Sequence, residues 1–339
     1  MKISTITWTL GIALGVGLVS QTQTVNAQAK TVRYQEYPGS IIHLANWVMV
    51  EKGMCTKHGL KCEPILLASG PLAQQAAAAG SVDLIVSSAD VMMQAAAKGN
   101  DLQILGTMIT NNVYSLAVAS DVPQPNRAAG YPGNMKDLVD KKIGVSARGS
   151  ATEMTAKALL TSAGLPADKA IFIAVGSPAT AFAALSAKQV DAILSWDPVP
   201  ALCAATGSCN VAVDLRRGEG PPEIAAMNGG NVVWQARREY VQKNGPTIDA
   251  FLSAYADAVQ WLRDAKNYPA ALELARKNFK IGDVPKREET LDRIVKESIS
   301  QYGTKFDRKV VKGFNDFLMK NGRIDKPLDA DAIVYRNAP

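Results

Sequence analysis

The sequence predicts an α/β fold of two lobes, each a doubly wound, mostly parallel sheet with flanking helices, and a ligand cleft between the lobes. Short apolar runs alternate with helical stretches through most of the chain, which is typical of strand–helix units. A segment rich in proline, glycine and asparagine at 121–134 divides these units into two similar series. The 339 residues are enough for two cores.

The first series of units predicts the first lobe. Each of its early apolar runs is followed by a small polar residue that can cap a helix, and each helix stops at or just before a glycine. We expect strands at 31–35, 62–67, 82–86, 102–107 and 114–119, and helices from Ser40 to Lys52, from Ser69 to Gly80 and from Ser88 to Gly99.

The second series resumes after the break. We expect strands at 142–145, 170–175, 190–196 and 231–235, helices at 150–163 and 178–187, and a second turn-rich break at 216–222. From Thr247 the chain is nearly all helical, with later segments at 268–279, 286–301 and 307–320. The expected division is a signal peptide at 1–27, lobe 1 at 28–119 and 227–339, and lobe 2 at 120–226.

An internal repeat supports two similar lobes. The segment AAGSVDLIVSS at 78–88 matches SAKQVDAILSW at 186–196, so that Val82 corresponds to Val190. The pairs Gly39-Ser40 and Gly149-Ser150 stand at corresponding helix starts. Each lobe is therefore expected to present helix N-termini to the cleft.

The strand–turn–helix segment at 142–164 is the strongest candidate for a ligand site. Ser150 fits an N-cap and Glu153 completes a capping box. Outward-pointing N–H groups at the helix start, with Arg148 beside them, favour a small anion. The alternative is an ordinary junction without a ligand, because such junctions recur in α/β proteins.

Residues 1–27 have the pattern of a secretory signal peptide. Lys2 precedes an apolar run at 6–19, and Val25-Asn26-Ala27 fits a cleavage site. The run is too short to span a membrane comfortably, and no cysteine follows the cleavage site to carry a lipid. We expect an exported, soluble protein.

The four cysteines form two close pairs, Cys55 with Cys62 and Cys203 with Cys209. An even number at close spacing in an exported chain predicts two disulfides, each worth roughly 2–3 kcal/mol through loop closure. Four separate buried thiols are the alternative. His43 and His58 do not complete a metal-ligand cluster with the cysteines, so we expect no metal.

The net charge of +6 does not indicate a nucleic-acid partner. Lys and Arg are spread along the chain, without a dense basic patch or a nucleic-acid-binding motif. We expect no nucleic acid to bind.

Short motifs in both lobes occur in an order that resembles one protein family. The second lobe has Gly-Ser-Ala-Thr at 149–152, Val-Asp-Ala at 190–192 and Trp-Asp-Pro at 196–198, and the first has Gly53, Leu-Ala-Ser-Gly at 67–70 and Gly-Ser-Val-Asp at 80–83. With an exported chain, these resemble the solute-binding proteins of ABC importers. They look most like the branch that serves sulfonates, taurine, nitrate and thiamine-pyrimidine precursors.

The resemblance implies a hinged periplasmic-binding-protein fold. Such a protein closes over a ligand in the periplasm and delivers it to a permease in the inner membrane. We expect a monomer without a cofactor. Carried over position by position, the ligand-binding residues would be Tyr37, Gly39, Ser40, Ser69, Gly70, Ser88, Ala89, Asp90, Arg148, Gly149, Ser150, Ala151, Thr152, Trp196 and Asp197. After the third strand, Ser88-Ala89-Asp90 departs from the acid or aromatic residue that the family often has there, which puts the usual ligands in doubt.

Each polar candidate also has a purely structural interpretation. Ser150 and Thr152 could bind an anion or only cap a helix, and Arg148 could pair with a carboxylate or sulfonate or face solvent. Trp196, like Tyr37, could form a wall of the cleft, or it could be a core aromatic. For Asp90 and Asp197, helix capping is the simpler interpretation.

We therefore predict a receptor for a small organic anion, a sulfonate or a carboxylate. A neutral aromatic heterocycle such as a thiamine-type pyrimidine is the alternative ligand. An enzyme on the same scaffold and a ligand-presenting subunit of a membrane sensor are alternative functions. No Ser-His-Asp set, metal cluster or phosphate-binding loop stands out, so we do not expect an enzyme.

Overall fold

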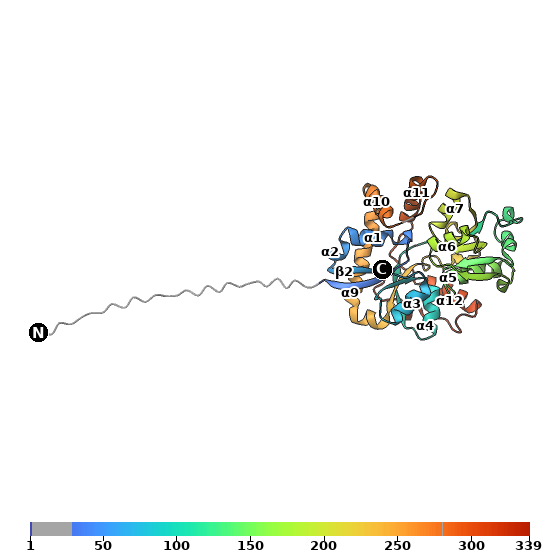
Figure 1. The fold of residues 1–339 in the computed structure, drawn as a ribbon. Coiled ribbons are helices and arrows are strands. Elements are labelled where there is room, and N and C mark those ends of the chain that lie inside the picture. The colour runs from blue at the N-terminus through green and yellow to red at the C-terminus, as the bar shows by residue number, and fades with distance from the viewer. Residues whose placement is uncertain (2–28, 280) are drawn as a thin grey trace.

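The computed structural model describes residues 1, 29–279 and 281–339. Residues 2–27 of the expected signal peptide lie outside this part. The described chain forms two lobes (Figure 1). We call lobe 1 the part built on strands β1–β4 and β10, and lobe 2 the part built on strands β5–β9. In Figure 1, α1, α2, α9 and α10 mark lobe 1, and α5, α6 and α7 mark lobe 2.

Lobe 1 contains a two-stranded sheet, β2-β1, and a three-stranded sheet, β3-β10-β4. A parallel bridge between Tyr34 of β1 and Leu84, the residue before β3, joins them in the order β2-β1-β3-β10-β4. Strands β1 and β2 are parallel, whereas β10 runs antiparallel to β3 and β4. The strands are β1 (Lys30–Glu36), β2 (Leu60–Leu66), β3 (Ile85–Ser87), β4 (Leu102–Thr107) and β10 (Val233–Arg237).

Lobe 2 repeats this arrangement in the order β7-β6-β8-β5-β9. Strand β6 is parallel to β7 and β8, and β5 is antiparallel to β8 and β9. The strands are β5 (Ser115–Ala119), β6 (Lys142–Val145), β7 (Ile171–Ala174), β8 (Ala192–Ser195) and β9 (Cys209–Asp214). Strands β3 and β8, which the internal repeat relates, take equivalent places in the two sheets.

Two expectations about the strands were wrong. The strand at 115–119 was assigned to lobe 1, but β5 pairs with β8 and β9 of lobe 2, so the chain crosses between the lobes before residue 115 and not after 119. Strand β9 was missed because the strand is short and its residues are mixed in polarity and partly buried. Each lobe thus receives its antiparallel strand, β5 or β10, next to a crossing.

Helices cover both sheets. Lobe 1 has α1 (Leu44–Glu51), α2 (Met54–Lys57), α3 (Gly70–Ala78), α4 (Ala89–Ala97), α9 (Arg238–Arg263), α10 (Tyr268–Asn278), α11 (Arg287–Ile299), α12 (Val310–Lys320) and α13 (Ala330–Ile333), and lobe 2 has α5 (Ala151–Ser162), α6 (Pro178–Ser186), α7 (Val199–Thr206) and α8 (Pro222–Ala225). Short 3-10 turns lie at Ile41–His43, Arg127–Ala129, Gly133–Leu138, Ala167–Lys169, Leu215–Arg217 and Ala265–Asn267. Helix α9 begins earlier than the expected Thr247, because the chain continues through a kink at Asn244 before Pro246.

The core of lobe 1 is centred on Trp234 of β10. Its indole makes edge-to-face contacts with Phe251 and Tyr255 of α9, at centroid distances of 5.0 and 5.7 Å, and with Tyr34 of β1 at 6.0 Å. All four rings are almost completely buried. Large aromatic contacts of this kind fix α9 on the sheet. The C-terminal helices therefore pack on lobe 1, and α11 also touches α7 of lobe 2.

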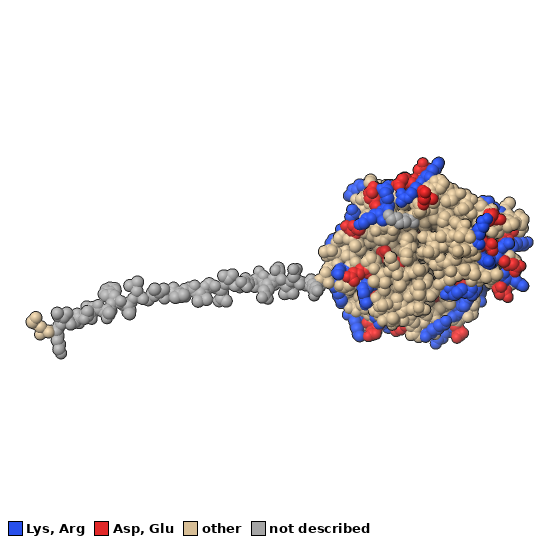
Figure 2. All heavy atoms as spheres, viewed as in Figure 1, with Lys and Arg blue, Asp and Glu red and all other residues tan. Residues whose placement is uncertain are grey.

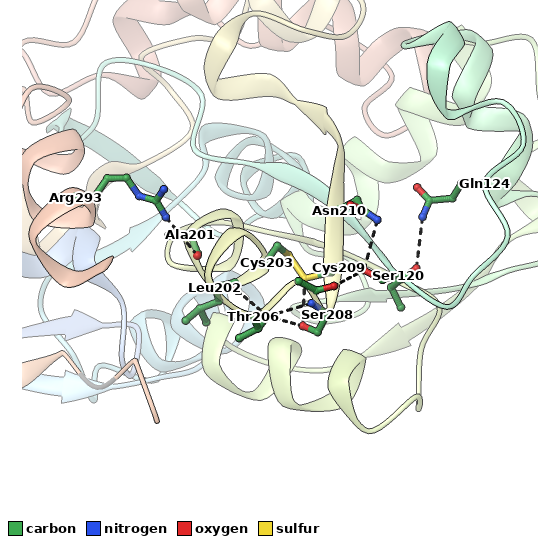
Figure 3. The surroundings of a disulfide bond; sticks show 12 residues. Ser120, Gln124, Ala201, Leu202, Cys203, Thr206, Ser208, Cys209, Asn210 and Arg293 are labelled. Atoms are coloured by element: carbon green, nitrogen blue, oxygen red, sulfur yellow. Dashed lines mark hydrogen bonds between the residues drawn. A yellow bond between two sulfur atoms is a disulfide. The ribbon is translucent and has the colours of Figure 1, made fainter. Parts of the chain in front are cut away.

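Both expected disulfides are present. Cys55–Cys62 joins α2 to β2 in lobe 1, and Cys203–Cys209 joins α7 to β9 in lobe 2 (Figure 3). Within the described residues, no group of three or more His, Cys, Asp or Glu side chains could hold a metal ion. None of the described helices is long and apolar enough to cross a membrane. Charged side chains of both signs are interspersed around the rim of the face in Figure 2.

Candidate functional site

A cavity lies between the two lobes, at the carboxyl ends of the parallel strands, where open α/β sheets place their ligands. Lobe 1 contributes Tyr37, Ile42, Gly70, Ser87, Ser88 and Val91, lobe 2 contributes Ser146, Ser150, Ala151, Thr152 and Trp196, and the two crossings contribute Val113, Tyr114, Asn231 and Val232. The space open to the centres of water molecules is only ≈ 30 Å³. The free volume between the lobes is therefore small.

Three helices begin at this cavity. Gly70 is the first residue of α3, Ser88 is the N-cap of α4, and Ser150 is the N-cap of α5. The first-turn N–H groups of Ala151 and Thr152 have no hydrogen-bond partner among the described residues. Helix N-termini carry partial positive charge, so their convergence makes the cavity favourable for a negative group.

The turn before α5 is held by side-chain hydrogen bonds. The Ser150 hydroxyl accepts from the Glu153 N–H at 3.4 Å, which confirms the predicted N-cap. The Glu153 carboxylate reaches back one residue further than a capping box requires and accepts from the Gly149 N–H at 2.6 Å, while the Ser150 N–H donates to the Ala147 carbonyl. Thr152 Oγ1 accepts from the Ser146 N–H at 2.9 Å and lies 2.8 Å from Ser150 Oγ. The hydroxyl groups and free N–H groups at this turn are thus fixed before a ligand arrives.

Aromatic rings form another part of the cavity wall. Trp196 packs edge-on against Tyr37 and Tyr114, with centroids 5.6 and 6.4 Å away. Its Nε1–H donates to Ser40 Oγ at 2.8 Å, which joins lobe 2 to lobe 1. The Tyr37 N–H donates to Nε2 of His43, and burial lowers the pKa of His43 to about 3, so this ring is neutral. His43 thus supports Tyr37 from behind the cavity.

Arg148 does not point into the cavity. Its guanidinium donates to the Phe172 carbonyl at 3.0 Å and pairs with the Glu153 carboxylate at 3.0 Å, and its side chain is 61% exposed. The capping residue Glu153 therefore holds the cation on the outer side of the turn. Among the described residues that line the cavity there is no Lys or Arg. The expected pairing of Arg148 with an anion has no support in this arrangement.

The structure brings together seven of the predicted site residues, namely Tyr37, Gly70, Ser88, Ser150, Ala151, Thr152 and Trp196, at one cavity. The others, Gly39, Ser40, Ser69, Ala89, Asp90, Arg148, Gly149 and Asp197, do not line it. Some of these support lining residues: Ser69 caps α3, and Asp197 binds Arg216 at 2.7 Å. The predicted list of ligand-binding residues did not include eight residues that line the cavity, namely Ile42, Ser87, Val91, Val113, Tyr114, Ser146, Asn231 and Val232.

Asp90 is a buried carboxyl group in the first turn of α4. Burial raises its pKa to about 6, although the Ser88 hydroxyl and the Val91 N–H at 2.8 Å favour its charged form. Burial and the nearby Asp90 carboxylate both raise the pKa of the Tyr37 and Tyr114 hydroxyls, which therefore stay protonated. Asp90 thus places a negative charge near the cavity at neutral pH and is mostly uncharged below its pKa.

Asp90→Asn is expected to stabilise the protein above about pH 6 by roughly 2–3 kcal/mol, and by little near pH 4. The folded-state pKa of about 6 lies above the ordinary value of 3.8 for an aspartate side chain, so the folded state holds the proton more tightly. The wild-type free energy of unfolding therefore falls as pH rises from about 4 to about 6, and an amide cannot ionise. Urea unfolding across this range measures the difference, with the exposed Asp168→Asn as the control. A difference independent of pH would contradict the raised pKa.

The two lobes, their repeated strand order and the cavity between them define the class as the periplasmic-binding-protein fold, a fold also described for a Candida albicans protein. A protein of Bordetella bronchiseptica RB50 superposes with a TM-score of 0.71 at 24% identity, covering 91% of this chain and 93% of that one. The alkanesulfonate-binding protein SsuA of Xanthomonas axonopodis pv. citri, bound to MOPS, gives a TM-score of 0.69 at 19% identity, covering 90% and 98%.

The family model described as NMT1/THI5 like matches residues 42–268, and the chain belongs to this family. A protein of Brucella abortus (strain 2308), provisionally named a binding protein, is 30% identical over 150 residues. That match covers 44% of this chain and 42% of the Brucella protein, so it spans less than half of either.

The same fold also occurs in an enzyme. The desulfurization enzyme DSZB superposes with a TM-score of 0.61 at 18% identity, covering 91% of this chain and 97% of that one. The fold alone does not decide between binding and catalysis, and the decision depends on the groups in the cavity.

Proposed function

We propose that this protein is the solute-binding component of an import system and captures a small organic anion, a sulfonate or a carboxylate, between its lobes. The convergence of three helix N-termini at one cavity carries the proposal, because it turns partial positive charge from both lobes toward a negative group. The free N–H groups of Ala151 and Thr152 add fixed hydrogen-bond donors from lobe 2. Ligand contacts in both lobes favour the closed form, which a membrane permease can distinguish from the open one.

The aromatic wall suits the remainder of the ligand. Tyr37, Tyr114 and Trp196 provide apolar surface in the same cavity as the turn before α5, and pockets of this kind combine apolar walls with a few placed polar groups. The α5 turn would orient the charged end of the ligand, and the rings would cover its apolar part. No cation is needed on the wall if the helix N-termini supply the positive potential.

A neutral aromatic heterocycle is the second candidate ligand. Two observations favour it: no Lys or Arg side chain is found among the described lining residues, and the Asp90 carboxyl lies close to Tyr37 and Tyr114. An ionised Asp90 would repel an anion, whereas an uncharged ring with N–H groups would not suffer this repulsion.

Isothermal titration calorimetry against sulfonates, carboxylates and uncharged pyrimidines tests the proposal. We expect an anion to bind best, and more tightly at about pH 5 than at about pH 8, because Asp90 loses its charge at the lower pH. Tighter binding of a pyrimidine, without this pH dependence, would replace the first candidate by the second. Recovery of a chemically altered ligand would instead indicate an enzyme.

Arg148→Ala is expected to leave the affinity for the anion within about twofold of the wild type, since exposed ion pairs contribute little. The Arg148 side chain is engaged by Glu153 and Phe172 on the outer side of the turn. Thr152→Val, which removes a hydroxyl at the cavity, is the positive control measured in the same titration. A large loss of affinity in Arg148→Ala alone would mean that the arginine turns inward when the ligand binds.

A further inference from the structure

A buried ion-pair cluster joins the two ends of the segment from Asp197 to Arg216, next to Trp196. Asp197 follows Trp196 directly, and Arg216 comes after α7 and β9. The Arg216 guanidinium donates to both oxygens of Asp214 at 2.8 Å, through Nε and Nη2, and through Nη1 to Asp197 Oδ1 at 2.7 Å. The three side chains are only 8–11% exposed. A buried arginine that bonds to two carboxylates fixes the geometry of both.

The same segment is also cross-linked by a disulfide bond. The disulfide Cys203–Cys209 joins α7 to β9 between the two ends of the loop (Figure 3). On the other side of α7, Arg293 of α11 donates to the Ala201 carbonyl at 3.4 Å, so lobe 1 also touches this segment. The segment from Asp197 to Arg216 is thus a ring, closed by the ion-pair cluster at its ends and by the disulfide within it.

We infer that Arg216, together with the Cys203–Cys209 disulfide, is a positioning device for Trp196 and so sets the shape of the ligand cavity from outside it. None of Asp214, Arg216 and the two cysteines lines the cavity. They fix the backbone next to Trp196, whose indole reaches Ser40 of lobe 1 and packs on Tyr37. The inference rests on the proposed function only in that the cavity binds the ligand.

The first experiment observes Trp196 without any ligand, by fluorine NMR of protein labelled with fluorotryptophan. The loss of one resonance in Trp196→Phe assigns the signal. Arg216→Lys keeps the charge but cannot hold two carboxylates with a planar fork. We expect the Trp196 resonance to move or split in Arg216→Lys and to stay in place in Arg217→Lys. The Arg217 side chain is 77% exposed and approaches Asp214 only to 3.5 Å. An unmoved resonance in Arg216→Lys overturns the inference.

Two further variants keep the test decisive if Arg216→Lys does not fold. Asp197→Asn removes one charge of the cluster and keeps its shape, and it is expected to move the same resonance. Replacing Cys203 and Cys209 together by serine is also expected to move it, whereas the same change at Cys55 and Cys62, in lobe 1, is not. Equal effects of the two cysteine double variants would mean that the disulfide acts on stability alone.

The second measurement is the affinity of Arg216→Lys for the ligand found by calorimetry. We expect a loss of about tenfold, with Arg217→Lys close to the wild type. A moved resonance with unchanged affinity would overturn the role in binding. If no compound in the panel binds the wild type, the proposed function fails, while the NMR result still decides whether Arg216 positions Trp196.

Discussion

Gly70→Val is expected to lower the affinity for the ligand by about a hundredfold or more while the protein remains folded. A Cβ atom at position 70 would lie 3.3 Å from Ser87 Cβ, 3.7 Å from Val91 Cγ1 and 3.8 Å from Tyr37 Oη. These neighbours line the same cavity, in which the space open to the centres of water molecules is ≈ 30 Å³. The two further methyl groups of valine would therefore occupy the space that the ligand needs.

A graded series makes this prediction sharp. Gly70→Ala adds only the Cβ and should cause an intermediate loss, since overpacking by a single carbon costs about 1–3 kcal/mol. The control is Gln75→Val, which introduces the same side chain on the exposed face of the same helix. Calorimetry measures binding, and thermal unfolding confirms that all three variants are folded. Wild-type affinity in Gly70→Val would show that the ligand binds elsewhere.

The repeated architecture could be predicted because its strands and helix starts have recognisable local sequence patterns. Apolar runs followed by capping residues mark strands and helix starts, so the helix beginning at Ser150 and the strand before it were identified from the residues alone. The match between 78–88 and 186–196 indicated equivalent places for β3 and β8. Sheet membership is not local: β5 was assigned to the wrong lobe because pairing with β8 and β9 depends on residues far along the chain.

The cavity residues at helix N-termini were predicted from the sequence. Those on the two segments that cross between the lobes were missed. Tyr114 and Asn231 reach the cavity only because the two crossings between the lobes meet beside it, and no spacing pattern records that meeting. The direction of the Arg148 side chain could also not be predicted from the local sequence pattern. Glu153 could be recognised as a capping residue, but the same carboxylate also draws Arg148 outward by an ion pair.

Trp196→Ala is expected to weaken ligand binding by about thirty- to a hundredfold, the effect of removing a central buried aromatic from a binding site. The substitution removes the wall that contacts Tyr37 and Tyr114 and also the hydrogen bond to Ser40. Because that bond joins the lobes, the variant should also be more open. Calorimetry measures the first effect, and the radius of gyration from small-angle X-ray scattering of the ligand-free protein measures the second.

The wall and the link between the lobes can be separated. Trp196→Phe keeps an aromatic wall but loses the N–H donor to Ser40, and a hydrogen bond of this kind is worth about 0.5–1.5 kcal/mol. We therefore expect Trp196→Phe to lose at most about tenfold in ligand affinity. It should open nearly as far as Trp196→Ala, because it also lacks the hydrogen bond to Ser40. Trp261→Ala, which removes a half-buried ring of α9 in lobe 1, controls for loss of an aromatic in general. If Trp196→Phe bound as weakly as Trp196→Ala, the contribution of Trp196 would be the contact between the lobes, and the ligand would not rest on its ring.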